Sequence, residues 1–315
     1  MGKKDIYTGP YLANKERAAE LINVNVYRGE NCVKPQMLSR LRGGYPSLAS
    51  VSGEKSRDIL MEHEMPRMRY GIELETESDY GMPERIMMYD VCDYEKQIKD
   101  RDQKYRGGKE YSNYKEKKSR MKKTDRLIPI TTLVLYLGEG KWEGPRSISE
   151  MSEMPSDLEP EMGIQDYRIK VIEADYVNPG DYKTDLKEFF RALQTRNDKK
   201  KLRELFETEE FQSLSRDAEL AIASNLNLKE MIVKIEKEEA TMCRAFKELM
   251  MEQEEIGIEK GIEKGIEKGI RENIRVLIEM CKEFGASQKD TEDKMIAKMS
   301  MEPEEAKRYV NQYWN

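Results

Sequence analysis

The stretch LIPITTLVLYLG, residues 127–138, has the strongest strand signal in the sequence. It is rich in β-branched residues and apolar at successive positions, so it would bury both of its faces, which is typical of a central strand. Three neighbouring stretches also predict strands: SRDILME at 56–62, RYGIELET at 69–76 and YRIKVIEADYV at 167–177. A sheet is therefore expected within the first 180 or so residues.

Helical patterns surround these strands. Asn14 can cap a helix over residues 14–26, where apolar residues recur at helical spacing, and a second helix is expected from Pro83 to Lys99. This order of elements indicates an α/β domain. Beyond Asp185 the pattern is helical throughout, and we expect four parts: an α/β domain at 1–182, a helical region at 183–254, a repeat at 255–272 and a small helical tail at 273–315.

The repeat is a four-residue unit, Gly-Ile-Glu-Lys, which occurs three times from Gly257 and ends at Gly269-Ile270. A period of four places glycine and isoleucine on two slowly drifting helical stripes. Each interior glycine costs a helix about 1 kcal/mol relative to alanine, so the repeat predicts a weak helix. We favour a helical linker, with pairing of two chains through the C-terminal helical region as the alternative.

Composition excludes several kinds of protein. The chain has 315 residues, and no stretch reaches the ~18 apolar residues that a membrane-spanning helix needs. The lysine-containing start lacks the apolar run of a secretory signal, and the four cysteines are widely spaced, so a cytoplasmic protein with reduced thiols is expected. One histidine and the absence of glycine-rich nucleotide motifs leave carboxylates, lysines and hydroxyls for any chemistry.

Carboxylates gather on the predicted strands. Glu73 and Glu75 would project from the same face of one strand, and Asp58 lies in another short strand that can converge with them. Three such carboxylates at adjacent strand ends suit Mg²⁺ or Mn²⁺, and such an ion activates water for phosphodiester hydrolysis. The alternative is a solvated strand face, because an acidic chain contains many such pairs.

Several segments, in order, resemble the recombination-promoting nuclease (Rpn) family, also described as putative YhgA-like transposases, of the PD-(D/E)XK nuclease superfamily. They are YLANKERAAELINVNVYRGENCVKP (11–35), SRDIL (56–60), GIELETESDYGMPERIMMYD (71–90) and RLIPITTLVLYLGEGKWEGPRSISEM (126–151). The Gly-Ile-Glu-Lys repeat and the closing AKRYVNQYW also resemble members with such tails. The resemblance implies a PD-(D/E)XK-like mixed sheet flanked by helices, followed by a helical C-terminal region.

The resemblance also implies roles for three acidic residues. Asp58 matches the first metal-binding aspartate of the family, and Glu73 matches the glutamate of its Gly-Ile-Glu segment. Glu16 matches an acidic residue of the first helix that can complete the metal site in this superfamily. A Mg²⁺ or Mn²⁺ ion held by Asp58, Glu73 and Glu16 is therefore expected.

Position 75 departs from the pattern. The superfamily has lysine there and the family usually has glutamine, whereas this chain has Glu75. A lysine would orient the attacking water or stabilise the charge of the transition state, and Glu75 supplies no positive charge. Glu75 would act as an extra metal ligand or as a base, or it would mark an inactive copy of the enzyme. Lys96, in the following helix, is a candidate to replace the missing lysine. Arg85, in the second matched segment, would contact a phosphate or else face solvent.

Positive charge is concentrated between Lys96 and Arg126, where thirteen lysines and arginines face only five acidic residues, although the whole chain carries −6. Three tyrosines are interleaved with them. A basic loop of this kind suits the DNA backbone, and Lys117, Lys118, Lys122 and Lys123 are the expected contacts. The alternative is a solvated loop.

These observations predict a metal-dependent DNA endonuclease associated with recombination or transposition, with Asp58, Glu73 and Glu75 as catalytic residues. The main alternative is a degenerate relative that binds DNA or protein partners without cleaving. A third is a helical oligomerisation protein whose α/β part is only structural.

Overall fold

The structure is a computed structural model that describes residues 3–41, 44–45, 55–153, 165–238 and 240–314. The chain forms two compact units, Met1–Phe246 and Lys247–Asn315. Each unit is described by itself.

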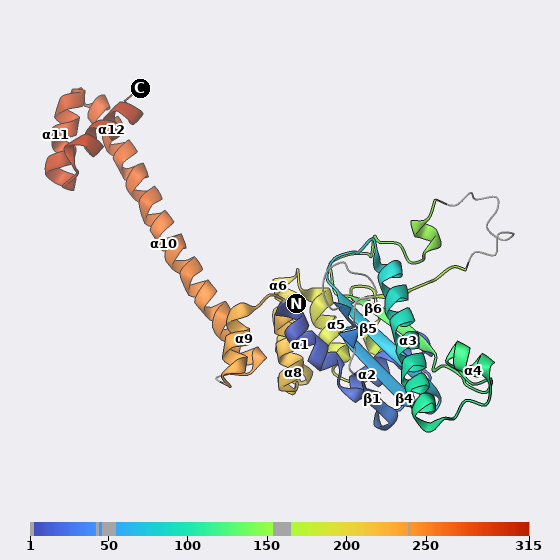
Figure 1. The fold of residues 1–315 in the computed structure, drawn as a ribbon. Helices are drawn as coiled ribbons and strands as arrows, with labels where there is room; N and C mark the ends of the chain where they lie inside the picture. Colours follow the sequence, from blue (N-terminus) through green and yellow to red (C-terminus); the bar gives the residue numbers. More distant parts are fainter. Residues whose placement is uncertain (1–2, 42–43, 46–54, 154–164, 239, 315) are drawn as a thin grey trace. The chain divides into compact units, whose positions relative to one another are not determined.

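The first unit contains a five-stranded mixed sheet with the strand order β1-β4-β5-β6-β7 (Figure 1). β1 (Leu38–Arg40), β4 (Ile59–Glu64) and β5 (Arg67–Glu75) pair antiparallel, whereas β6 (Ile130–Tyr136) and β7 (Lys170–Glu173) continue the sheet in parallel. A separate pair is formed by β2 (Gly44–Tyr45) and β3 (Lys55–Ser56). The expected α/β class is confirmed, and each of the four predicted stretches contains a strand.

Helices account for most of the rest of the chain. In the first unit they are α1 (Lys3–Leu12), α2 (Lys15–Val26), α3 (Met82–Gly108), α4 (Tyr114–Ser119), α5 (Leu186–Thr195), α6 (Lys199–Phe206), α7 (Glu209–Gln212), α8 (Arg216–Asn225) and α9 (Lys229–Glu236). Asn14 caps α2 as predicted, because its side chain accepts a hydrogen bond from the backbone N–H of Glu16 at 2.9 Å. α3 is longer than predicted and extends nine residues past Lys99.

Successive side chains of β5 project from opposite faces of the sheet. Gly71, Glu73 and Glu75 lie on the face that α3 covers, in front of the sheet in Figure 1. Met82, Ile86 and Tyr89 of α3 pack there in one buried cluster with the β6 residues Val134 and Tyr136 and with Trp142. Tyr70, Ile72 and Leu74 are buried on the opposite face. Tyr27, the residue that ends α2, shares a 2.7 Å hydrogen bond with Tyr70 on that opposite face.

The helices α5–α9 belong to the same compact unit as the sheet. Arg17 of α2 is buried and donates to Asp185 at 2.6 Å and also to Asp217 of α8. The rings of Tyr11 and Phe189 lie 5.2 Å apart between centroids. The domain boundary expected at residue 182 therefore falls inside the first unit.

α10 (Met242–Glu283) begins in the last residues of the first unit and is one continuous helix through the repeat; α11 (Gln288–Met299) and α12 (Pro303–Tyr313) follow in the second unit. Ile274 and Ile278 pack with Met295 of α11 and with Ala306 and Val310 of α12. The boundaries expected at 254 and 272 both lie within α10. Among the described residues, no helix combines the length and the apolar character needed to cross a membrane.

Candidate functional site

Asp58 lies in a bend immediately before β4, rather than inside the strand that the sequence predicts. The pairing of β4 with β5 begins one residue later, at Ile59 and Ile72. Asp58 is nevertheless close enough to Glu73 of β5 for its negative charge to act on that residue. The backbone N–H of Leu74 donates to Asp58 Oδ2 at 2.8 Å, which fixes this carboxylate beside β5. Two acidic residues fifteen positions apart in the sequence thus lie near each other at this end of β5.

Glu73 is a buried acid whose side chain is incompletely satisfied. The residue is only 3% exposed, and its Oε1 atom has no hydrogen-bond partner among the described residues. Burial, followed by the negative charge of Asp58, raises the pKa of Glu73 from 4.5 to about 8, while Arg57 and Arg85 act in the opposite direction. At neutral pH this carboxyl group therefore retains its proton unless a further positive charge approaches.

Arg57 provides a buried positive charge next to the Asp58–Glu73 pair. Its Nη1 donates to Thr132 Oγ1 at 2.6 Å and its Nη2 donates to Asp90 of α3. The guanidinium group crosses β5 at Gly71, where a Cβ atom would lie 2.3 Å from Arg57 Nη1. Glycine at position 71 therefore makes room for this arginine. Sequence reasoning did not identify Arg57, although it immediately precedes Asp58.

Glu75 lies on the same face of β5 and is paired with Arg85. Arg85 Nη2 donates to Glu75 Oε1, and its Nη1 lies 3.0 Å from Asp79 Oδ2. The arginine expected to contact a phosphate is thus engaged by two carboxylates in this structure. Lys96, the proposed substitute lysine, is an exposed residue eleven positions further along α3, about 16 Å away along the helix axis.

Glu16 is not brought to the pair. It is exposed in the first turn of α2, the helix whose last turn leads into Tyr27 on the opposite face of the sheet. Within the described part of the chain, no group of three or more histidine, cysteine, aspartate or glutamate residues is arranged to hold a metal ion. The carboxylates that do meet are Asp58 and Glu73, with Glu75 held by Arg85 on the same face.

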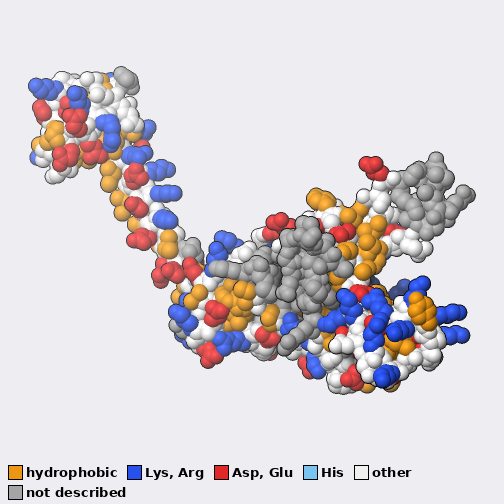
Figure 2. Space-filling view, viewed as in Figure 1, with side chains coloured by type: hydrophobic (Ala, Val, Ile, Leu, Met, Phe, Trp, Pro, Cys, Tyr) orange, Lys and Arg blue, Asp and Glu red, His pale blue; other side chains and the backbone are white. Residues whose placement is uncertain are grey.

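The basic segment is more ordered than the expected loop. Residues 96–108 continue α3, and α4 follows. Internal pairs join α3 to the segment after α4: Arg120 donates to both oxygens of Glu95, and Tyr105 donates to Asp125 at 2.8 Å. Figure 2 shows Lys and Arg side chains gathered around α4. Lys117, Lys118 and Lys123 are exposed there.

Lys122 differs from the other three expected DNA contacts. Its Nζ lies 2.9 Å from Glu110 Oε2 and 4.1 Å from the centre of the Tyr105 ring. The hydrogen bond that Lys122 donates to the Glu110 carboxylate raises the pKa of this lysine. Lys122 therefore has a structural role that the three exposed lysines do not share.

Comparisons of the chain with protein-family models, with curated proteins and with solved structures found no match. The resemblance to the recombination-promoting nucleases stays a prediction from the quoted segments.

Proposed function

We propose that the first unit is a metal-dependent DNA endonuclease of the PD-(D/E)XK type, acting in DNA recombination or transposition. The observation that carries the proposal is that Asp58, just before β4, lies beside Glu73 of β5, with one buried glutamate oxygen unpartnered among the described residues. Further support comes from the exposed basic side chains in and after α4, the helix that follows α3.

The donor set fits Mg²⁺ or Mn²⁺. Magnesium is commonly held by one or two protein carboxylates, with water and substrate phosphate oxygens completing its coordination. Asp58 has one oxygen bound to the backbone of Leu74, and Glu73 offers its unpartnered Oε1. When bound, the ion would supply an activated water molecule and stabilise negative charge on the phosphate.

The residues of the chain would then have distinct tasks. Asp58 and Glu73 would hold the ion, and Glu73 would do so in its deprotonated form. Arg57 supplies positive charge next to Asp58 and Glu73, and its hydrogen bonds to Asp90 and Thr132 fix its position. Arg85 and Glu75 form an ion pair in which the arginine brings positive charge to the face that lacks the family's lysine. Exposed lysines of the basic segment hold the DNA backbone.

Plasmid cleavage with Mg²⁺ tests the proposal. Asp58→Asn and Glu73→Gln should each abolish nicking, whereas Glu77→Gln, an exposed acid just beyond β5, should leave it unchanged. A calorimetric Mg²⁺ titration gives a second readout, because proton release from Glu73 should weaken binding about tenfold per pH unit below pH 8. Equal nicking by all four proteins would remove the proposed site.

The alternative is a degenerate enzyme that binds DNA or protein partners without cleaving. It is favoured by the Glu75–Arg85 ion pair, which places an acid where the superfamily has a lysine. Glu75→Gln and Glu75→Lys separate the two proposals. If the wild type is inactive and either variant cleaves, the site is degenerate at this position and otherwise intact.

DNA is the proposed partner of the basic segment. Replacing Lys117, Lys118 and Lys123 by glutamine should reduce the slope of log affinity against log salt by about one unit per lost phosphate contact. Lys122→Gln is the matched comparison, because that lysine is bound to Glu110 and should affect local stability more than the slope. A slope that no variant changes would contradict DNA contact here.

Homodimerisation through the C-terminal helical region is also proposed, and the cytoplasmic location stays a prediction. Ile258, Ile262 and Ile266 are 58–59% exposed along α10, where Figure 2 shows hydrophobic side chains in line. Sedimentation of the full chain should give a dimer. Replacing these three isoleucines by glutamine should then give a monomer; a wild-type monomer would contradict the proposal.

A further inference from the structure

The short helix α4 is held in place by bonds within its own segment and to α3. Asn113 caps α4 by accepting a hydrogen bond from the backbone N–H of Glu116 at 3.0 Å. Glu116 in turn accepts a hydrogen bond from the backbone N–H of Ser112 at 3.0 Å. Just after the helix, Arg120 donates to both oxygens of Glu95 in α3. The side chains of α4 are therefore presented from a fixed position beside α3.

Two of the three tyrosines in the basic segment are bonded to neighbouring acids. Tyr105 donates to Asp125 at 2.8 Å, and Tyr111 donates to Asp102 at 2.7 Å. Their rings pack edge to face, with the centroids 5.4 Å apart. The ammonium group of Lys122 also lies 4.1 Å from the centre of the Tyr105 ring. These two rings therefore contribute to the packing of the segment itself.

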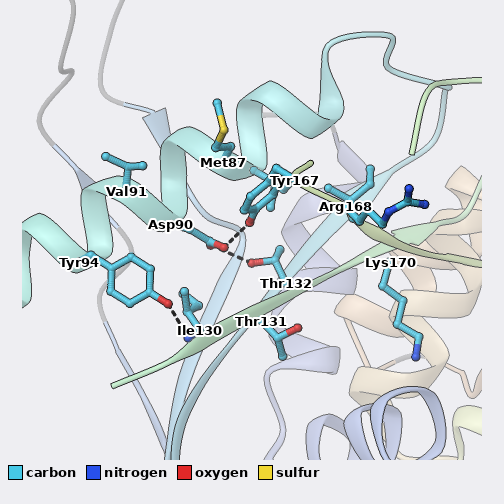
Figure 3. Close-up of a pocket in the computed structure, with 12 residues that line it drawn as sticks. Met87, Asp90, Val91, Tyr94, Ile130, Thr131, Thr132, Tyr167, Arg168 and Lys170 are labelled. Carbon is cyan, nitrogen blue, oxygen red and sulfur yellow. Dashed lines mark hydrogen bonds between the residues drawn. The ribbon is translucent and has the colours of Figure 1, made fainter. Parts of the chain in front are cut away.

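Tyrosines between α3 and the sheet are also engaged by protein groups (Figure 3). Tyr167 and Thr132 both donate to Asp90, and Tyr94 accepts a hydrogen bond from the backbone N–H of Ile130 at 3.3 Å. Tyr167 packs against the buried cluster that α3 forms with the sheet. These rings hold α3 on the sheet, and the carboxylate of Asp90 already has its partners within the protein.

Tyr114, in the first turn of α4, differs from these tyrosines. It is 76% exposed, and its hydroxyl group has no hydrogen-bond partner among the described residues. Lys117 and Lys118 follow three and four positions later in α4, so they lie on the same side of the helix as Tyr114. Both lysines are exposed and have no ion pair in the described part of the chain. We call these three residues the Tyr114 surface.

The acidic residues next to the Tyr114 surface are bonded to other groups. Glu110 binds Lys122 at 2.9 Å, and Glu116 accepts the hydrogen bond from the backbone of Ser112. Lys123, just after α4, is also exposed and has no ion pair with any described residue. The lysines around Tyr114 therefore keep their positive charge for an anion that comes from outside the protein.

We propose that the Tyr114 surface binds an unpaired DNA strand, with one base stacked on the Tyr114 ring and the adjoining phosphates at Lys117 and Lys118. The inference takes its DNA partner from the proposed function and adds the substrate class, DNA that contains a single-stranded stretch. In a duplex each base is covered by its neighbours, whereas an unpaired base can offer a face to a protein ring. An exposed aromatic ring among lysines supplies both the stacking and the phosphate contacts that single strands require.

One strand can reach both the Tyr114 surface and the Asp58–Glu73 pair. Glu95, which holds Arg120 just after α4, lies ten residues beyond Arg85 in α3, about 15 Å along the helix axis. At about 3.4 Å per nucleotide, a strand of four or five nucleotides covers this distance. The unpaired stretch would therefore lie a few nucleotides from the phosphate that the proposed nuclease attacks.

Fluorescence anisotropy with a short labelled single strand and the matching duplex tests the inference. The full-length chain is used at low salt with EDTA, so that no metal-dependent cleavage occurs. Tyr114→Ala should weaken binding of the single strand about tenfold and leave the duplex affinity unchanged, and Tyr114→Phe should retain wild-type binding of both. Tyr176→Ala, which removes a tyrosine that is 56% exposed outside the basic segment, is the matched control. An equal effect of Tyr114→Ala on both ligands, or no effect on either, would overturn the proposal.

A strand of the same length with abasic positions separates stacking from phosphate contact. It should bind the wild type about as weakly as the complete strand binds Tyr114→Ala, and Tyr114→Ala should not weaken it further. A further loss on the abasic strand would contradict stacking, because Tyr114 would then act on the backbone or on the fold. An RNA strand of the same sequence that bound more tightly than the DNA strand would overturn the assignment to DNA.

The same titrations keep this inference apart from the proposed cleavage reaction. Glu73→Gln should bind the single strand like the wild type, because Glu73 lies outside the Tyr114 surface. If the wild type does not cleave but Tyr114→Ala selectively weakens the single strand, the nuclease proposal fails and this inference stands. If the wild type cleaves and Tyr114→Ala binds the single strand normally, this inference fails alone.

Discussion

Replacement of Glu73 by glutamine should change how folding stability depends on pH. The pKa of Glu73 is about 8 in the folded chain, compared with the ordinary 4.5 expected when the chain unfolds. Between these values the unfolded chain binds fewer protons than the folded one, so stability falls as pH rises and levels off above pH 8. Glutamine resembles the protonated acid and does not titrate, so it should remove this decline.

The size of this change in folding stability follows from the difference between the two pKa values of Glu73. Each pH unit between the two pKa values corresponds to about 1.4 kcal/mol, so the wild type should lose roughly 3 kcal/mol relative to Glu73→Gln between pH 5.5 and 7.5. The buried position of Glu73 means that solvent screens little of this difference.

Urea unfolding at several pH values, in buffer without divalent cations, measures the difference. The chain has two tryptophans, so a Trp314→Phe background leaves the fluorescence of buried Trp142, which packs edge-to-face on Tyr136 at 5.4 Å. Glu77→Gln should show no pH-dependent difference from its background. Curves for wild type and Glu73→Gln that stay parallel from pH 5.5 to 8.5 would refute the reasoning, because Glu73 would then titrate normally.

Three further changes test the packing. Gly71→Ala should lower the free energy of unfolding by about 2–4 kcal/mol in the same urea assay, because its Cβ displaces the buried Arg57; unchanged stability would show that Arg57 adjusts freely. Gly265→Ala should instead stabilise α10 by up to about 1 kcal/mol, since no described atom lies within 4 Å of the added Cβ, and a circular-dichroism melt measures this. Arg17→Met should cost about 3–5 kcal/mol in urea unfolding by leaving Asp185 without its buried partner, and a loss below 1 kcal/mol would contradict that role.

Local patterns predicted the parts of the fold that depend on neighbouring residues. β-Branched and apolar residues at 127–138 identified β6, and the alternation of RYGIELET placed Glu73 and Glu75 on one face. The length of α3 was underestimated, because its second half is polar and has no apolar stripe to mark it. In that half, pairs such as Arg106 with Asp102 one turn away support the helix.

The hydrogen bonds among Arg57, Asp90 and Thr132 could not be predicted from local sequence patterns. Arg57 meets Asp90, 33 residues later, and Thr132 meets Asp90 across 42 residues. No periodicity links such positions; they meet because β6 joins β5 in parallel and α3 crosses both. Glycine at position 71 was a signal within the sequence, since Arg57 can cross β5 only where a side chain is missing.

The charge balance around Glu73 explains why a divalent cation is the expected occupant. Five carboxyl groups surround the site and two arginines oppose them: Asp58, Glu73, Glu75, Asp79 and Asp90, with Arg57 and Arg85. With Glu73 protonated, the formal charge of this group is −2. Both arginines also have carboxylate partners, Arg57 in Asp90 and Arg85 in Glu75, so their positive charge is shared among several acids. A divalent ion would bring two positive charges and displace one proton, which leaves −1.

In the ordinary nuclease pattern a lysine at position 75 would reduce the negative charge before any ion binds. In the proposed nuclease, Glu75 with Arg85 would make the site more dependent on the ion, so Glu75→Lys should lower the pKa of Glu73 and weaken its preference for a divalent cation together.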